Sequence, residues 1–321
     1  MTNDAEIRKN IAVKLEHVTK RIGRKTIIDD LSFEIYGGEV FGFLGPNGAG
    51  KTTTIRMIVG LMRMTKGNIF IQGHSVKTEF KQAMRQVGAI VENPEMYKFL
   101  TGYQNLLHYA RMIPGIGKER IHEVIKRVGL EERIHEKVKR YSLGMRQRLG
   151  VAQAMLHRPS VLILDEPTNG LDPQGIHDLR NDLHRLAREE GVAVIVSSHL
   201  LSEMELMCDR IGIIQNGQLL GVETVSDFVQ NGGGKVRFSV DDGTSAAQVL
   251  KQNLAIEASS IKPDAIEVTV EHDKIPVIVD ALVGSKVKIY GVVSVTQSLE
   301  ERFLEVTGGK ALVSFGRIDP E

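Results

Sequence analysis

The sequence has little of several features that would each assign it to a class of protein. It contains one cysteine, Cys208, so the chain can form no internal disulfide bond, which fits a reducing compartment. Its polar start, residues 1–10, has no apolar signal region, and no stretch approaches the roughly 18 apolar residues that a membrane-spanning helix needs. The 41 basic and 40 acidic residues nearly balance, so charge does not predict nucleic-acid binding. If the protein acts at a membrane, we expect it to act as a peripheral protein on the membrane surface.

The length of 321 residues, with 42% hydrophobic residues, allows about two domains with proper cores. The stretch NGGG at 231–234 predicts a linker. We therefore predict a first domain over residues 1–230, a small α+β domain over 235–307 and a tail over 308–321. Within the first domain, a β region at the N-terminus precedes an α/β core. Apolar residues at helical spacing predict a helical insert over about 93–158.

The stretch from 45 to 53, GPNGAGKTT, contains the pattern G-x-x-x-x-G-K-[ST]. An apolar strand over 40–44 precedes it, and a helical pattern over 53–62 follows, a context that predicts a phosphate-binding loop rather than a chance glycine-rich turn. Glycines let the backbone bend so that its N–H groups point at a phosphate chain, and the helix start adds further donors. Lys51 would contact the β and γ phosphates, and Thr52 would offer a hydroxyl to Mg²⁺. The predicted nucleotide-binding residues here are Gly45, Pro46, Asn47, Gly48, Ala49, Gly50, Lys51, Thr52 and Thr53.

A second motif, VLILDE, ends a fully apolar strand in Asp165 and Glu166. Ligands of open α/β sheets bind at the carboxyl ends of the strands, so these acids should face the phosphate loop. Asp165 would hold Mg²⁺, and Glu166 would act as general base on the attacking water. Without the phosphate loop, the pair would be two solvated acids at a strand end.

A third stretch, YSLGMRQR at 141–148, would alone be only a helix N-cap at Ser142. Its place shortly before the strand that ends in Asp165 gives it more weight. With this motif order, residues 11–222 resemble the nucleotide-binding subunit of an ABC transporter. The phosphate loop matches the Walker A motif, Asp165 the Walker B aspartate and Glu166 the catalytic glutamate. Residues 141–145 stand where the family has its LSGGQ signature.

The resemblance implies a P-loop ATPase of the ABC type with a mixed sheet, binding ATP and Mg²⁺ as a head-to-tail dimer. Ser142 and the backbone of Gly144 would contact the γ-phosphate held by the other subunit. His199 would be the switch histidine, in contact with the γ-phosphate in its own subunit. Asp172 would close the D-loop, 169–172. The implied catalytic residues are therefore Glu166, His199 and Lys51.

Three positions depart from the family pattern around the nucleotide. Leu143 replaces a signature glycine. Glu92 stands where most members have the glutamine that ligates Mg²⁺, and glutamate can still do so. Ile22 stands where an aromatic ring normally stacks on adenine, and apolar contact replaces stacking only in part. We therefore predict weak discrimination between ATP and GTP.

The signature YSLGMRQRL, the sequence at 92–94 and the C-terminal segment 298–306 resemble the bacitracin-resistance type of exporter ATPase. This implies a peripheral subunit at the cytoplasmic face of the membrane, acting as a homodimer on a separate permease to export an antimicrobial peptide or drug-like amphiphile. The alternative is a non-transport ABC-type ATPase with a regulatory or nucleic-acid-associated role. A kinase or GTPase would lack the signature. An apolar cluster is predicted either to contact the permease or simply to pack the insert: Met96, Tyr97, Phe99 and Leu100.

Overall fold

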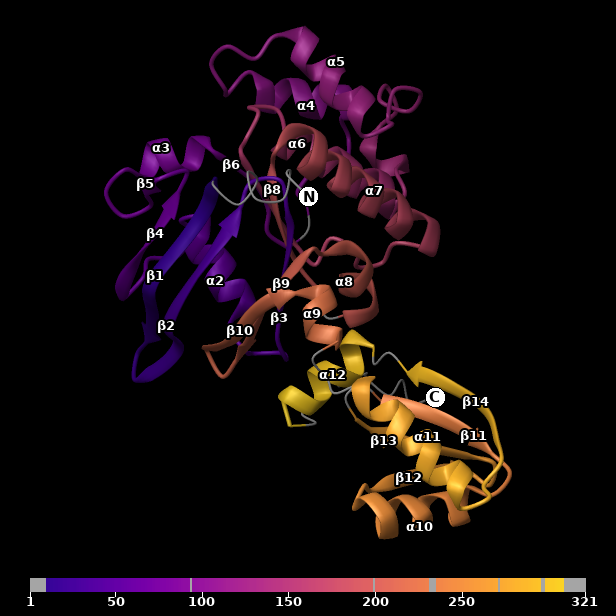
Figure 1. Ribbon diagram of the computed structural model, residues 1–321. Helices are drawn as coiled ribbons and strands as arrows, with labels where there is room; N and C mark the ends of the chain where they lie inside the picture. The colour runs from indigo at the N-terminus through magenta and orange to yellow at the C-terminus, as the bar shows by residue number, and fades with distance from the viewer. Residues whose placement is uncertain are drawn as a thin grey trace, which may run out of the picture. The chain divides into compact units, whose positions relative to one another are not determined.

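The computed structural model describes residues 10–92, 94–198, 200–230, 235–270, 272–295 and 298–308 (Figure 1). The predicted linker at 231–234 and residues 309–321 of the predicted tail lie outside the described residues. The chain forms two compact units, one reaching Glu223 and the other beginning at Thr224.

The first unit contains a small antiparallel sheet of order β2-β1-β4-β5. Its strands are β1 (Ile11–Ile22), β2 (Lys25–Tyr36), β4 (Lys66–Ile71) and β5 (His74–Ser75). Apolar side chains from three of these strands, including Leu15, Ile35 and Ile69, are buried in one core with residues of the neighbouring central sheet. The predicted β region at the N-terminus therefore belongs to a four-stranded antiparallel sheet.

The central sheet has six strands in the order β10-β9-β3-β8-β7-β6. They are β3 (Val40–Leu44), β6 (Val87–Ile90), β7 (Val161–Asp165), β8 (Ala193–Ser197), β9 (Arg210–Gln215) and β10 (Gln218–Thr224). The pairs β6–β7, β7–β8, β8–β3 and β3–β9 are parallel. Every residue of β3, β7 and β8 is buried, as expected for parallel strands covered on both faces. The loops after these strands consequently share one edge of the sheet.

Four helices accompany these sheets: α2 (Lys51–Ile58), α3 (Phe80–Arg85), α7 (Pro173–Glu190) and α8 (Leu201–Met207). Helix α2 ends four residues before the end of the predicted pattern at Met62, because Gly60 has a φ of 73°, outside the helical region. Short α3 was not predicted. The helical insert is confirmed as α4 (Gly102–Ala110), α5 (Lys118–Arg127), the 3₁₀ helix η1 (Val138–Arg140) and α6 (Leu143–Ala154).

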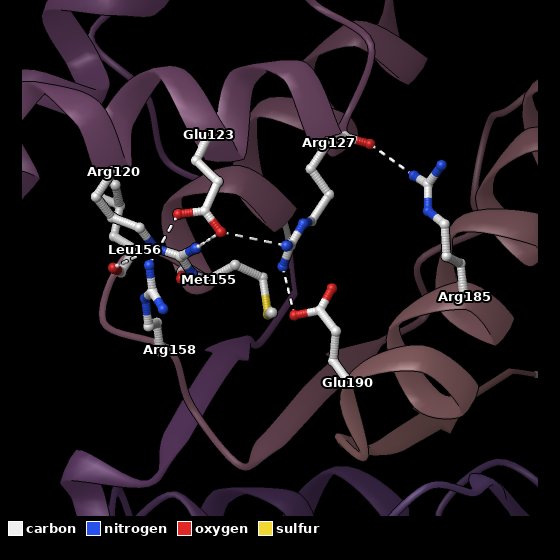
Figure 2. Close-up of polar contacts among 8 residues, drawn as sticks. All are labelled: Arg120, Glu123, Arg127, Met155, Leu156, Arg158, Arg185 and Glu190. Atoms are coloured by element: carbon white, nitrogen blue, oxygen red, sulfur yellow. Dashed lines mark hydrogen bonds and ion pairs between the residues drawn. The ribbon is translucent and has the colours of Figure 1, made fainter.

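A network of arginines and glutamates fastens α5 to the elements beside it (Figure 2). The guanidinium of Arg120, on a residue only 7% exposed, donates to the carbonyls of Met155 and Leu156, just after the end of α6. Glu123 accepts from Arg120 at 2.7 Å, from Arg158 at 3.0 Å and from Arg127 at 3.3 Å. Arg127 also pairs with the last residue of α7, Glu190. The network therefore ties the insert to the end of α6 and to α7.

The second unit has a four-stranded antiparallel sheet of order β12-β13-β11-β14. Its main elements follow a β-α-β-β-α-β order, a known supersecondary arrangement. They are β11 (Lys235–Val240), α10 (Gly243–Leu254), β12 (Ala258–Lys262), β13 (Ala265–Thr269), α11 (Ile275–Gly284) and β14 (Ile289–Val295), with α9 (Val225–Gln230), η2 (His272–Lys274) and α12 (Leu299–Val306) around them. Phe238 and Leu250 lie in its separate core. Strand β12 and helix α9 were not predicted.

These features confirm the predicted α/β fold class, with a mixed central sheet, an N-terminal antiparallel region and a helical insert. Among the helices that the structure describes, none has both the length and the apolar character to cross a membrane.

Candidate active site

The phosphate loop connects β3 to α2 at the edge where the parallel strands end, as the motif predicts. Gly50 closes the loop with a φ of 115°, and a Cβ there would lie 2.3 Å from Cδ1 of Ile28 on β2. The positive φ favours glycine, and a side chain here would also require the tip of Ile28 to move. The second glycine of the pattern therefore lets β2 pack directly against the loop.

Lys51 lies inside the loop rather than in solvent. It is 8% exposed, and its Nζ donates to the carbonyl of Gly45 at 2.6 Å. Burial lowers the pKa of Lys51, while the charges of Glu166 and Asp165 act against that shift. A buried ammonium group at the start of a helix is well suited to a phosphate group.

Asp165 ends β7 and is only 5% exposed. Ser197, at the end of β8, lies directly opposite in the parallel pairing and donates its hydroxyl to Oδ1 of Asp165 at 2.5 Å. Burial raises the pKa of Asp165, and the Ser197 hydrogen bond and Lys51 oppose that shift only in part. The position therefore favours a cation near the carboxylate.

Glu166 follows with a φ of 52°, an uncommon backbone angle for a residue with a side chain. Its N–H donates to the carbonyl and to the hydroxyl of Ser197, both at 3.1 Å. Unusual backbone angles of this kind cluster at active sites, where the surroundings hold them in place. The Ser197 hydroxyl thus contacts both predicted acids, and the Ser197 carbonyl adds a second contact to Glu166.

Glu92 follows β6 with a φ of 67°, and its carboxylate forms an ion pair with Arg56 on α2. Its charge contributes to the raised pKa of Asp165, which places it in the same electrostatic environment. The residue predicted to ligate Mg²⁺ is thus paired with a cation of the helix that follows the phosphate loop. Asn93 lies outside the described residues.

The donor set suits Mg²⁺, which binds oxygen ligands and usually takes one or two carboxylates together with phosphates and water. Thr52, Asp165 and Glu92 are the predicted oxygen donors, and the electrostatic cost of ionised Asp165 would be relieved by a divalent cation. Within the described residues, no group of three or more His, Cys, Asp or Glu side chains could hold a metal by itself. The residues present therefore fit a magnesium ion that arrives with a nucleotide.

The signature segment begins α6. The Ser142 hydroxyl accepts from the N–H of Met145 at 3.2 Å, so Ser142 caps its own helix. Leu143, which replaces a signature glycine, packs on the predicted D-loop. A Cβ on Gly170 would lie 2.4 Å from Cδ2 of Leu143. Asp172 caps α7 by accepting from the N–H of Gly175 at 3.0 Å. The signature and the D-loop are therefore packed together within one chain.

The remaining predicted positions fall in different places. Ile22 ends β1 and is 53% exposed, at the tip of the β1–β2 hairpin. Tyr97 and Phe99 are 44% and 68% exposed, with ring centroids 5.8 Å apart. Cys208 is buried. His199 lies outside the described residues.

Two residues with a clear role at this edge were missed from the sequence. Ser197 follows an apolar strand as Asp165 does, and that shared signal was available. Arg56 gave no signal, because a basic residue on a helix is usually solvated.

Comparison with known proteins identifies the family of the chain. Residues 28–169 match the family described as ABC transporter. The chain is 56% identical over 296 residues to the ABC transporter ATP-binding protein YhcH of Bacillus subtilis (strain 168), covering 92% of this chain and 96% of that protein. It is 38% identical over 298 residues to the bacitracin transport ATP-binding protein BcrA of Bacillus licheniformis, covering 92% and 97%.

Among solved structures, the chain is similar to the ATP-binding cassette MJ0796 in a dimeric post-hydrolysis state with ADP and Pi. The TM-score is 0.59 at 25% identity, over 66% of this chain and 98% of that chain. The resemblance to ABC transporter subunits, including the bacitracin type, is confirmed. On its sequence, fold and site, the chain belongs to the ATP-binding proteins of ABC transporters, which are ATPases.

Proposed function

We propose that this protein is the motor subunit of a transporter, in which two copies hydrolyse ATP head-to-tail on a separate membrane permease. The convergence of Lys51, Asp165 and Glu166 at one sheet edge carries the proposal. In this proposal, residues 1–230 form the ATPase domain, with the insert at about 93–158. Residues 235–307 form an accessory domain, followed by a tail, 308–321.

In the proposed reaction, the loop N–H groups and Lys51 bind the β and γ phosphates. Thr52, Asp165 and Glu92 would hold Mg²⁺, which supplies neutralisation of phosphate charge when bound. Glu166 accepts a proton from the attacking water. The water oxygen forms a bond to the γ-phosphorus, the bond to the β–γ bridging oxygen breaks, and ADP and phosphate are left. His199 is proposed to contact the γ-phosphate, as the family resemblance implies.

The second copy is proposed to supply the other half of each site, through Ser142, Gly144 and Asp172. Ser142 lies at the N-terminus of α6, where free N–H groups favour an anion. A dimeric structure of the similar cassette MJ0796 supports this arrangement. Closing the two copies on the nucleotide would exclude water from the developing charge.

Glu166→Gln tests the base. We expect ATP binding to survive, the closed dimer to persist, and turnover to fall by about 100-fold or more, the usual range for a lost general base. Near-normal turnover would remove Glu166 from that role.

Ser142→Arg tests the contact between copies. The monomer should bind ATP as before, while hydrolysis that depends on dimer formation should stop, because a bulky cation occupies the shared surface. Unchanged hydrolysis would show that the trans contact is not used.

Ile22 motivates a test of base selectivity. An exposed aliphatic residue offers less to a purine ring than an aromatic one does. Similar kcat/KM values for ATP and GTP are expected, and a strong ATP preference would contradict this assignment.

The transported cargo is proposed from the bacitracin transport relative: an antimicrobial peptide or a drug-like amphiphile moved out of the cell. The protein would then lie at the cytoplasmic face of the membrane. The exposed pair Tyr97 and Phe99, in the cluster with Met96 and Leu100, is proposed to contact the permease. Phe99→Ser should abolish co-purification with the permease and leave ATP binding intact. Co-purification with DNA or ribosomes instead would favour the non-transport alternative.

A further inference from the structure

The turn between β9 and β10 is packed against the phosphate loop, although it lies far along the chain from it. Asn216 and Gly217 form this turn, with φ values of 51° and 80°. The N–H of Gly217 donates to the carbonyl of Ala49 at 3.0 Å. The carbonyl of Gly217 accepts from the N–H of Asp29 on β2 at 2.8 Å. The turn thus connects β2 to the loop through both of its backbone polar groups.

No side chain fits at Gly217. A Cβ there would lie 2.2 Å from the carbonyl oxygen of Ile27. The preceding strand is equally close to the loop, because a Cβ on Gly45 would lie 2.4 Å from the carbonyl oxygen of Ile214. The end of β9 and the turn that follows it therefore pack closely against the outer side of the phosphate loop.

This contact sets the direction of one loop amide. The peptide between Ala49 and Gly50 is planar and trans, so its C=O and its N–H point in opposite directions. Because the Ala49 carbonyl points outward to Gly217, the Gly50 N–H is turned toward the inside of the loop. An inward N–H is what a phosphate oxygen needs from this loop.

We propose that Gly217 is a positioning residue for nucleotide binding, which holds the Ala49–Gly50 peptide so that the Gly50 N–H faces phosphate. This inference rests on the proposed phosphate site. It assigns to the β9–β10 turn a role in phosphate affinity that is separate from its role in connecting the two strands.

The chain contains a matched control for this proposal. The turn between β4 and β5 is built from Gln72 and Gly73, with φ values of 48° and 78°, nearly the same backbone. A Cβ on Gly73 would meet nothing within 4 Å. Gly217→Ala and Gly73→Ala therefore carry a similar backbone penalty, and only in the first does the added Cβ meet another segment, at Ile27 of β2.

The experiment measures the affinity of the full-length variants for ADP and for pyrophosphate, each with Mg²⁺, by titration calorimetry. Gly217→Ala should weaken both ligands by about tenfold or more, the scale of one hydrogen bond to a charged group. Gly73→Ala should stay within about twofold of wild type, since a twofold change is well below one such bond. Equal affinities in the two variants would overturn the proposal.

A second pair of variants applies if Gly217→Ala does not fold. One glycine inserted between Asn216 and Gly217 adds no side chain but moves the Gly217 N–H from its place opposite the Ala49 carbonyl, and one glycine inserted between Gln72 and Gly73 is its control. Insertions at surface turns cost little in loop entropy. Only the first insertion should weaken pyrophosphate binding, and equal binding by both insertions would overturn the proposal.

Lys51→Ala separates this inference from the proposed function. If Lys51→Ala binds ADP as wild type does, the phosphate site itself is wrong. If Lys51→Ala loses binding while the variants at Gly217 match those at Gly73, the site stands and the role of Gly217 fails.

Discussion

Arg120→Met should destabilise the first unit strongly, because this guanidinium fastens the helical insert to the end of α6 (Figure 2). The substitution removes two hydrogen bonds to backbone carbonyls and the ion pair with Glu123. A hydrogen bond from a charged donor is worth about 1.5–3 kcal/mol. Water can reach part of the vacated space, and Glu123 keeps Arg127 and Arg158. We therefore expect a loss of about 2–4 kcal/mol in the free energy of unfolding.

Arg158→Met is the control within the same network. Arg158 also pairs with Glu123, but its side chain is 72% exposed, so its loss should cost less than about 1 kcal/mol. The loss in the free energy of unfolding caused by Arg120→Lys should lie between those of Arg120→Met and Arg158→Met. One ammonium group cannot replace all the contacts of the planar guanidinium of Arg120.

Thermal unfolding of the full-length protein, followed by circular dichroism, checks this series. At roughly 2–4 °C per kcal/mol for a unit of this size, Arg120→Met should lower the Tm by about 5–15 °C. Equal losses from Arg120→Met and Arg158→Met would refute the reasoning, because burial would then not decide the strength of the contact.

Three further predictions concern the site and the core. Gly170→Ala should be destabilising because of its φ of 71° and its contact with Leu143, and Leu143→Ala should relieve part of that cost, with a coupling energy of at least about 0.5 kcal/mol in a double-mutant cycle. Arg56→Met should weaken MgATP binding by up to about fivefold, since Glu92 loses its counter-charge; adding Glu92→Gln should restore affinity, and failure of that rescue would show that the pair is not an electrostatic unit. Burial lowers the pKa of His157, so the unfolded state binds its proton more readily and stability should fall as pH decreases below about 6.5. Urea unfolding between pH 7 and 5 should show a smaller fall in His157→Gln, and an equal fall would contradict this.

The main parts of the active site were predictable because each carries a strong local signal. The loop at 45–53 combines a specific spacing with a strand and a helix, and Asp165 ends a fully apolar strand. Such signals depend on residues close together in the chain. The predicted fold class followed from the family resemblance that these motifs carry, and the missed elements α3, α9 and β12 are too short to show a clear period.

The contacts that position these residues were not predictable. Ser197 reaches Asp165 only because β7 and β8 pair in that register. Arg120 lies on a helix rich in charged residues, KERIHEVIKR, where nothing in the pattern separates a buried arginine from solvated ones. The contact between Gly217 and Ala49 joins segments far apart in the chain, and a hairpin signal says nothing about what its turn will touch.

The central position of β3 has a consequence for synthesis of the chain. Val40 pairs with Val194, and Phe41 pairs with Arg210. The strand before the phosphate loop therefore pairs with strands that lie roughly 150 residues later in the chain, and such a separation slows folding. At about 5–20 residues per second, β3 leaves the ribosome on the order of 10 s before either neighbour is made. During that interval β3 lacks both of its strand partners, and its unpaired backbone is exposed to chaperones and to aggregation. The nucleotide loop is therefore translated early but completed late, and acquisition of ATP binding should coincide with closure of the whole first unit.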